Sequence, residues 1–77
     1  MVKITATILK DKQNEVHEEF IKAVKNIWDF CAKKEHENDV KVTMKAEILY
    51  DKALPEVYKQ LAELDGIKSI NIQEILN

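Results

Sequence analysis

The chain has 77 residues, which fits one small domain over residues 1–77 and leaves no room for a second. Hydrophobic residues make up 45% and charged residues 34%, a balance that excludes a disordered tail. The formal net charge is −2, and all 12 basic residues are lysines. Because arginine is absent and there is no basic excess, we expect no nucleic-acid partner.

Cys31 is the only cysteine, which excludes an internal disulfide and favours a reducing compartment. No apolar run approaches the length of about 18 residues that spans a bilayer, so we expect no membrane insertion of this segment. The first residues lead directly into a strand pattern, and we expect no signal peptide. These features predict a cytoplasmic location, either for the whole protein or for the soluble domain of a membrane protein.

Residues 2–9 alternate in polarity and predict a strand with one buried face. Its apolar positions are Val2, Ile4, Ala6 and Ile8. A polar break follows at residues 10–14. We expect Asn14 to cap the next helix, because its side chain can accept a hydrogen bond from a free backbone N–H of the first turn.

From Val16 onward the apolar residues recur at helical spacing and predict a first helix. Its end has two interpretations. One continues the helix to about His36. The other ends it near Asn26 and starts a strand at Ile27, which makes residues 28–36 a strand. We favour the strand because Trp and Phe suit strands and because residues 37–39 suit a hairpin loop. Such a strand would point Trp28, Phe30 and Ala32 inward, and Asp29, Cys31 and Lys33 outward.

The clearest strand pattern lies at residues 40–50, where apolar residues occupy every second position. Leu54-Pro55 begins a second helix, because proline is tolerated in a first turn. Gly66 ends it, since glycine accepts the conformation common just after a helix. Residues 67–76 predict a last strand with Ile70 and Ile72 facing inward.

The resulting order, β-α-β-β-α-β, predicts an α+β ferredoxin-like sandwich with a four-stranded antiparallel sheet and two helices on one face. The outward strand residues would form an open polar surface without an aromatic side chain. The predicted core of the domain consists of apolar residues that point inward from the strands and helices. They are Phe20, Val24, Met44, Ile48, Leu61 and Ile70.

The sequence offers no constellation for catalysis. Cys31, His17 and His36 lack the spacing of a metal site, and Cys31 has no evident base beside it. A single glycine excludes a glycine-rich phosphate loop. We therefore expect no catalytic residue, no metal site and no cofactor, and the chain is not predicted to be an enzyme.

The second half of the chain carries a family resemblance, from Val40-Lys41-Val42-Thr43-Met44-Lys45-Ala46 to Leu61-Ala62-Glu63-Leu64-Asp65-Gly66-Ile67-Lys68-Ser69-Ile70. It resembles ACT-type modules, which often close with a helix, an Asp-Gly-Val/Ile turn and a strand. Residues 10–14 lack the Asp-x-Pro-Gly-like turn of the ACT modules that bind amino acids. In its element layout and its Gly66–Ile70 segment the chain is also similar to the C-terminal cytosolic domain of MgtC/SapB-type membrane proteins.

The resemblance implies a non-catalytic regulatory or protein-interaction module, part of a membrane protein linked to magnesium limitation. The alternative that it implies is an ACT-type sensor of a small ligand, either an amino acid or an ion, that acts through a dimer interface. In the usual ferredoxin-like order the last strand is an edge, which exposes unpaired backbone groups. We expect a homodimer or a docking site for the parent membrane domain at Ile70, Ile72, Ile75 and Leu76.

Overall fold

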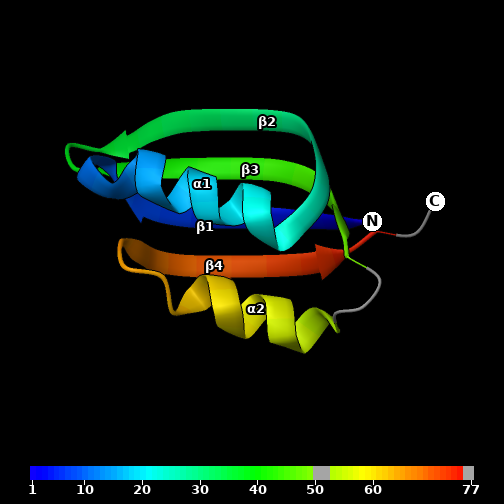
Figure 1. Ribbon diagram of the computed structural model, residues 1–77. Coiled ribbons are helices and arrows are strands. Elements are labelled where there is room, and N and C mark those ends of the chain that lie inside the picture. The colour runs from blue at the N-terminus through cyan, green and yellow to red at the C-terminus, as the bar shows by residue number, and fades with distance from the viewer. Residues whose placement is uncertain (50–52, 76–77) are drawn as a thin grey trace.

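The computed structural model describes residues 1–49 and 53–75. In chain order its elements are β1 (Val2–Leu9), a short 3-10 turn η1 (Lys10–Lys12), α1 (Gln13–Ala23), β2 (Val24–His36), β3 (Asp39–Ile48), α2 (Leu54–Ala62) and β4 (Ile67–Glu74). The strands form one four-stranded sheet in the order β2-β3-β1-β4, and α1 and α2 lie on the same side of it (Figure 1). The ferredoxin-like prediction is confirmed, including the position of the last strand at an edge.

Strand β1 is the centre of the sheet, because it pairs antiparallel with both β3 and β4. Its even-numbered residues face the helices and are 0 to 3% exposed. Ile4, for example, lies opposite Met44 on one side and Ile72 on the other. The alternation in the sequence therefore reports correctly which face of β1 is buried.

Helix α1 begins at Gln13, and the prediction that Asn14 caps it is wrong. Gln13 follows η1 directly, and its backbone N–H donates to the carbonyl of Lys10. The turn thus satisfies this N–H from the backbone, and Lys12, at the N-cap position, makes no side-chain capping bond. Asn14 lies inside the first turn of the helix instead.

The boundary between α1 and β2 decides between the two interpretations of residues 28–36. The helix ends at Ala23, and β2 starts at Val24 with no loop between them. Residues 28–36 are strand, as we favoured, and β2 pairs antiparallel with β3. The strand starts three residues before the predicted Ile27, since Val24 is already extended (φ −126°, ψ 162°) and lies opposite Ile48.

A bulge in β2 overturns the predicted orientation of Trp28. The register shifts between Trp28 and Cys31, and Asp29 within the bulge has a φ of +50°. The bulge places two residues of β2 opposite one residue of β3. Because of the extra residue, the side chains before the bulge point to the opposite face from the one that strict alternation predicts. Trp28 therefore lies opposite Lys45 on the open face of the sheet, whereas Ala32 lies opposite the buried Val42.

Phe30 keeps its predicted side: its ring meets the ring of His17 of α1 edge-on, with centroids 4.9 Å apart. It is nevertheless 44% exposed, and β2 is an edge strand of the sheet. Cys31 and Lys33 face outward as predicted, opposite Thr43 and Lys41. Among the described residues, the open face thus carries one aromatic side chain, Trp28, and the prediction that it has none is wrong.

The core lies between the sheet and the two helices. Of the predicted core residues, Phe20, Val24, Met44 and Leu61 are buried, whereas Ile48 and Ile70 are half-buried and pack against the core from its margin. In α2, Val57 and Leu61 are buried, and Pro55 lies in the first turn as predicted. The prediction that Gly66 ends this helix is wrong, because α2 ends at Ala62 and Gly66 lies in the turn before β4. Strand β3 ends at Ile48, and the predicted strand residue Tyr50 lies outside the described residues.

Replacing Phe20 tests the core directly. Phe20 is 1% exposed, so Phe20→Ala should lower the free energy of unfolding by about 3–5 kcal/mol. The neighbouring Ile21 is 53% exposed, and Ile21→Ala serves as the matched control with an expected loss below about 1 kcal/mol. Urea unfolding followed by circular dichroism measures both. Equal losses would show that α1 presents a different face to the sheet.

Candidate functional site

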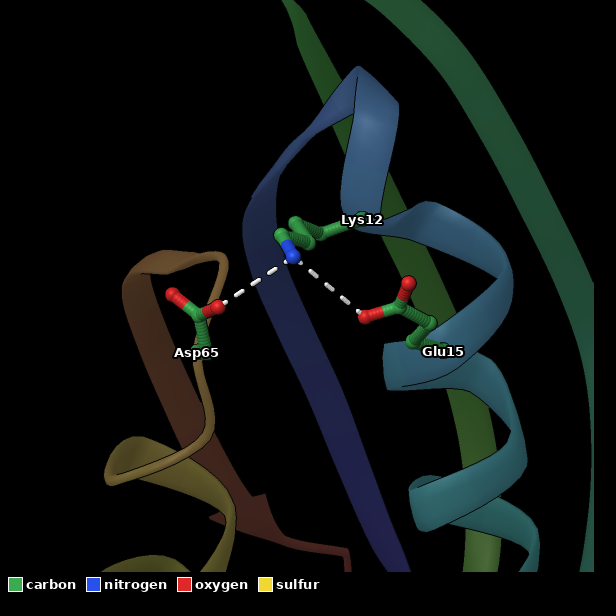
Figure 2. Close-up of polar contacts among 3 residues, drawn as sticks. All are labelled: Lys12, Glu15 and Asp65. Atoms are coloured by element: carbon green, nitrogen blue, oxygen red, sulfur yellow. Dashed lines mark ion pairs between the residues drawn. The ribbon is translucent and has the colours of Figure 1, made fainter.

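A charged cluster joins the two turns at one end of the molecule. Lys12 ends η1, Glu15 lies in the first turn of α1, and Asp65 lies in the turn after α2 (Figure 2). The Lys12 Nζ lies 3.4 Å from Asp65 Oδ2 and 3.6 Å from Glu15 Oε2. The sequence spacing of Lys12 and Glu15 is typical of a helical ion pair, but nothing in the sequence indicates the contact with Asp65.

The cluster raises the pKa of Lys12, first through its hydrogen bond with Asp65 and then through the charge of Glu15. A lysine that works as a base or nucleophile needs a lowered pKa, so that it loses its proton near neutral pH. The pKa of Lys12 is raised instead of lowered. The arrangement therefore fits an exposed electrostatic tether between two turns, and not a catalytic group.

A shallow groove of about 330 Å³ lies beside this cluster, between α1 and the turn after α2. Its lining residues are Glu15, Val16, Glu18, Glu19, Leu64 and Asp65. Lys12 pairs with Glu15 and Asp65, and Lys22 pairs with Glu19 at 3.5 Å. Within residues 1–49 and 53–75, no three His, Cys, Asp or Glu side chains converge in a way that could hold a metal ion.

Gly66 fixes how closely the two turns approach each other. Its φ is +102°, a conformation that residues with a side chain rarely adopt. A Cβ at this position would collide with Lys12 Cβ, far inside van der Waals contact. The Gly66 carbonyl also accepts a hydrogen bond of 2.8 Å from the N–H of Leu9, at the end of β1.

Gly66→Ala should therefore destabilise the protein by about 2 kcal/mol or more, through its backbone conformation and through the clash with Lys12. Thermal or urea unfolding measures the loss. The double variant Lys12→Gly/Gly66→Ala removes the clash and should recover part of the stability, whereas Lys12→Ala/Gly66→Ala keeps the Lys12 Cβ position filled and should recover less. A loss below about 0.5 kcal/mol for Gly66→Ala would contradict the close approach.

The three residues considered for metal binding lie apart. Cys31 is exposed on the open face of β2, His17 contacts Phe30 from α1, and His36 ends β2 opposite Asp39. Asp39 is only 7% exposed, and its carboxylate pairs with Lys68 at 2.9 Å. These groups do not converge into one site among the described residues.

The residues predicted for association lie on β4 or just after it. Ile70 and Ile72 are half-buried on the helix-covered face, opposite Ala6 and Ile4 of β1. The half-buried Ile75 donates its backbone N–H to the carbonyl of Met1 at 3.0 Å. Leu76 lies outside the described residues. Among the described strands, none pairs with the outer side of β4.

The opposite edge, β2, differs from β4 in regularity. Its pairing with β3 shifts register at three places, after Val24, after Trp28 and after Lys34. The pairing of β4 with β1 shifts only near its start, between Thr7 and Ile8, and is regular from Ser69 to Glu74. Bulges and charged side chains are the devices by which proteins protect edge strands from pairing. Such protection is present along β2 and is missing along most of β4.

Comparison with known proteins adds no family to this geometry: no protein-family model matches the chain, and no curated protein matches it. The resemblance to ACT-type and MgtC/SapB-type domains stays a prediction. Across the part of the chain that the structure describes, neither helix is long and apolar enough to cross a membrane.

Proposed function

We propose that this chain is a non-catalytic regulatory module that acts by self-association through the outer edge of β4. The observation that carries the proposal is the contrast between the two sheet edges. Strand β4 offers a regular stretch from Ser69 to Glu74, whereas β2 is interrupted by bulges. An unprotected edge presents a row of backbone donors and acceptors that a second strand can pair with.

A second copy of this chain is the occupant that β4 fits best. In a two-fold antiparallel pair of β4 strands, every residue i faces a residue j of the partner, and j faces i. With the axis at Asn71, Ile70 would face Ile72, Ser69 would face Gln73, and the Lys68 end of the strand would meet the Glu74 end. In this register apolar residues face apolar residues, polar residues face polar residues, and lysine faces glutamate.

The burial of β4 also supports this occupant. Ile70 and Ile72 are half-buried, whereas the inward residues of the central strand β1 are at most 3% exposed. A second sheet edge beside β4 would cover this remaining apolar surface. A domain of this size has a limited core and gains stability from such burial. Association would then be the event that such a module senses or transmits, whether it is a separate protein or the soluble domain of a larger one.

Charge variants at Asn71 test the proposed pairing. Asn71→Lys places two ammonium groups opposite each other at the axis and should raise the dimer Kd about fivefold, as expected for a directly opposed like-charge pair. Asn71→Asp should weaken the dimer similarly, and an equal mixture of the two variants should restore association. Sedimentation equilibrium from micromolar to millimolar concentration measures each Kd.

Thr5→Lys is the matched control, because Thr5 lies opposite Asn71 on the open face but belongs to the central strand β1. It adds the same charge and should leave the dimer Kd within about twofold of the unsubstituted value. A strict monomer at millimolar concentration, or a dimer that neither Asn71 variant weakens, would contradict self-association through β4.

A further inference from the structure

The open face of the sheet is organised in three cross-strand rows by the register of its strands. Each row runs from β2 through β3 and β1 to β4. The rows are Trp28–Lys45–Lys3–Gln73, then Cys31–Thr43–Thr5–Asn71, then Lys33–Lys41–Thr7–Ser69. The middle row is uncharged, whereas each outer row contains two lysines that lie directly opposite each other on neighbouring strands.

Such like-charge pairs destabilise a sheet, because directly opposed side chains have Cβ atoms only about 5 Å apart. One pair is relieved: Lys45 Nζ lies 3.3 Å from the carboxylate of Asp29 in the β2 bulge. For Lys33 and Lys41, no ion pair is found among the described residues. Asp39, two residues before Lys41, has its charge engaged by Lys68 at 2.9 Å.

The uncompensated pair borders a hollow. Cys31, Lys33, Lys41 and Thr43 line a depression of about 290 Å³ on the open face. Its lining offers two ammonium groups and one hydroxyl as hydrogen-bond donors, and it contains no carboxylate. A charge arrangement that costs stability in the free protein, and that surrounds a hollow of ligand size, is expected at a binding site rather than on an ordinary solvated surface.

We propose that this hollow binds the phosphate group of a small phosphate compound, with Lys33 and Lys41 on either side of it and the Thr43 hydroxyl as a further donor. A phosphate dianion can neutralise two ammonium charges at once, and the ammonium group of lysine binds phosphate as a point charge. The hollow lies at the small end of the range for ligand pockets, so it suits a phosphate with a small substituent. The site belongs to β2 and β3 and does not depend on association through β4.

Pyrophosphate is the probe for this site, with inorganic phosphate as a second arm. Titration at constant ionic strength, followed by backbone NMR shifts, should give saturable changes at residues 31–33 and 41–43 with a Kd below about 1 mM for pyrophosphate. Lys33→Gln and Lys41→Gln should each raise this Kd at least about fivefold. Lys59→Gln, which removes one charge from the exposed surface of α2, is the matched control and should leave the Kd within about twofold.

A second readout separates a binding site from a structural role. In buffer without phosphate, Lys33→Gln and Lys41→Gln should keep or raise the melting temperature, because each relieves the repulsion within the pair. Both should also lose the rise in melting temperature that pyrophosphate gives the unsubstituted protein.

Three outcomes would overturn the proposal. The first is the absence of saturable shifts up to about 10 mM pyrophosphate, a concentration at which weak binding of about 1 mM would be near saturation. The second is equal weakening by Lys59→Gln, which would show non-specific charge attraction. The third is a short single-stranded oligonucleotide that binds at least about tenfold more tightly than pyrophosphate and depends on Trp28, which would assign the face to nucleic acid instead.

Discussion

The pairing of β1 with strands on both sides is the constraint on which the rest of the structure depends. Its inward residues form the middle of the core, and hydrogen bonds at its C-terminal end hold two turns of the chain in place. Leu9 donates its N–H to the carbonyl of Gly66, and Lys10 donates to the carbonyl of Asn38, both at 2.8 Å. The turn after α2 and the β2–β3 hairpin are thereby held at the same end of the sheet. Glycine at position 66 allows the first of these contacts, because a side chain there would collide with Lys12.

The helices cover only one face of the sheet, and this asymmetry explains why the polar and charged strand residues gather on the other face. The covered face uses the apolar half of each alternating strand for the core, so the other half faces solvent. There the strands place lysines opposite lysines in two rows. The same architecture leaves β4 at an edge, and from Ser69 to Glu74 this strand has none of the register shifts that interrupt β2. The two proposed sites are therefore separate: association is proposed at the β4 edge, and anion binding is proposed on the open face between β2 and β3.

Strict patterns in the sequence predicted most of the fold. The alternation of residues 2–9 matches β1 residue for residue, and Pro55 correctly indicates where α2 begins. Gly66 does not indicate where the helix ends: it lies four residues after Ala62, in the turn that leads into β4. The start of β2 was less predictable, because Val24 is apolar and buried whether it closes a helix or opens a strand. The orientation of Trp28 could not be derived at all, since no glycine indicates the bulge at Asp29 and the bulge reverses the alternation. The contact between Lys12 and Asp65 depends on tertiary structure, and the sequence contains no local signal for it.

Amide hydrogen exchange at two protein concentrations tests whether β4 is the associating edge. Alternate amides of residues 69–74 point away from β1, and in dilute solution they should exchange as fast as other exposed amides. At millimolar concentration the same amides should become protected, while the outward amides of β2 stay fast and those of β1 stay slow throughout. Exchange along β4 that is independent of concentration, or new protection along β2 instead, would contradict the proposal that this protein associates through β4.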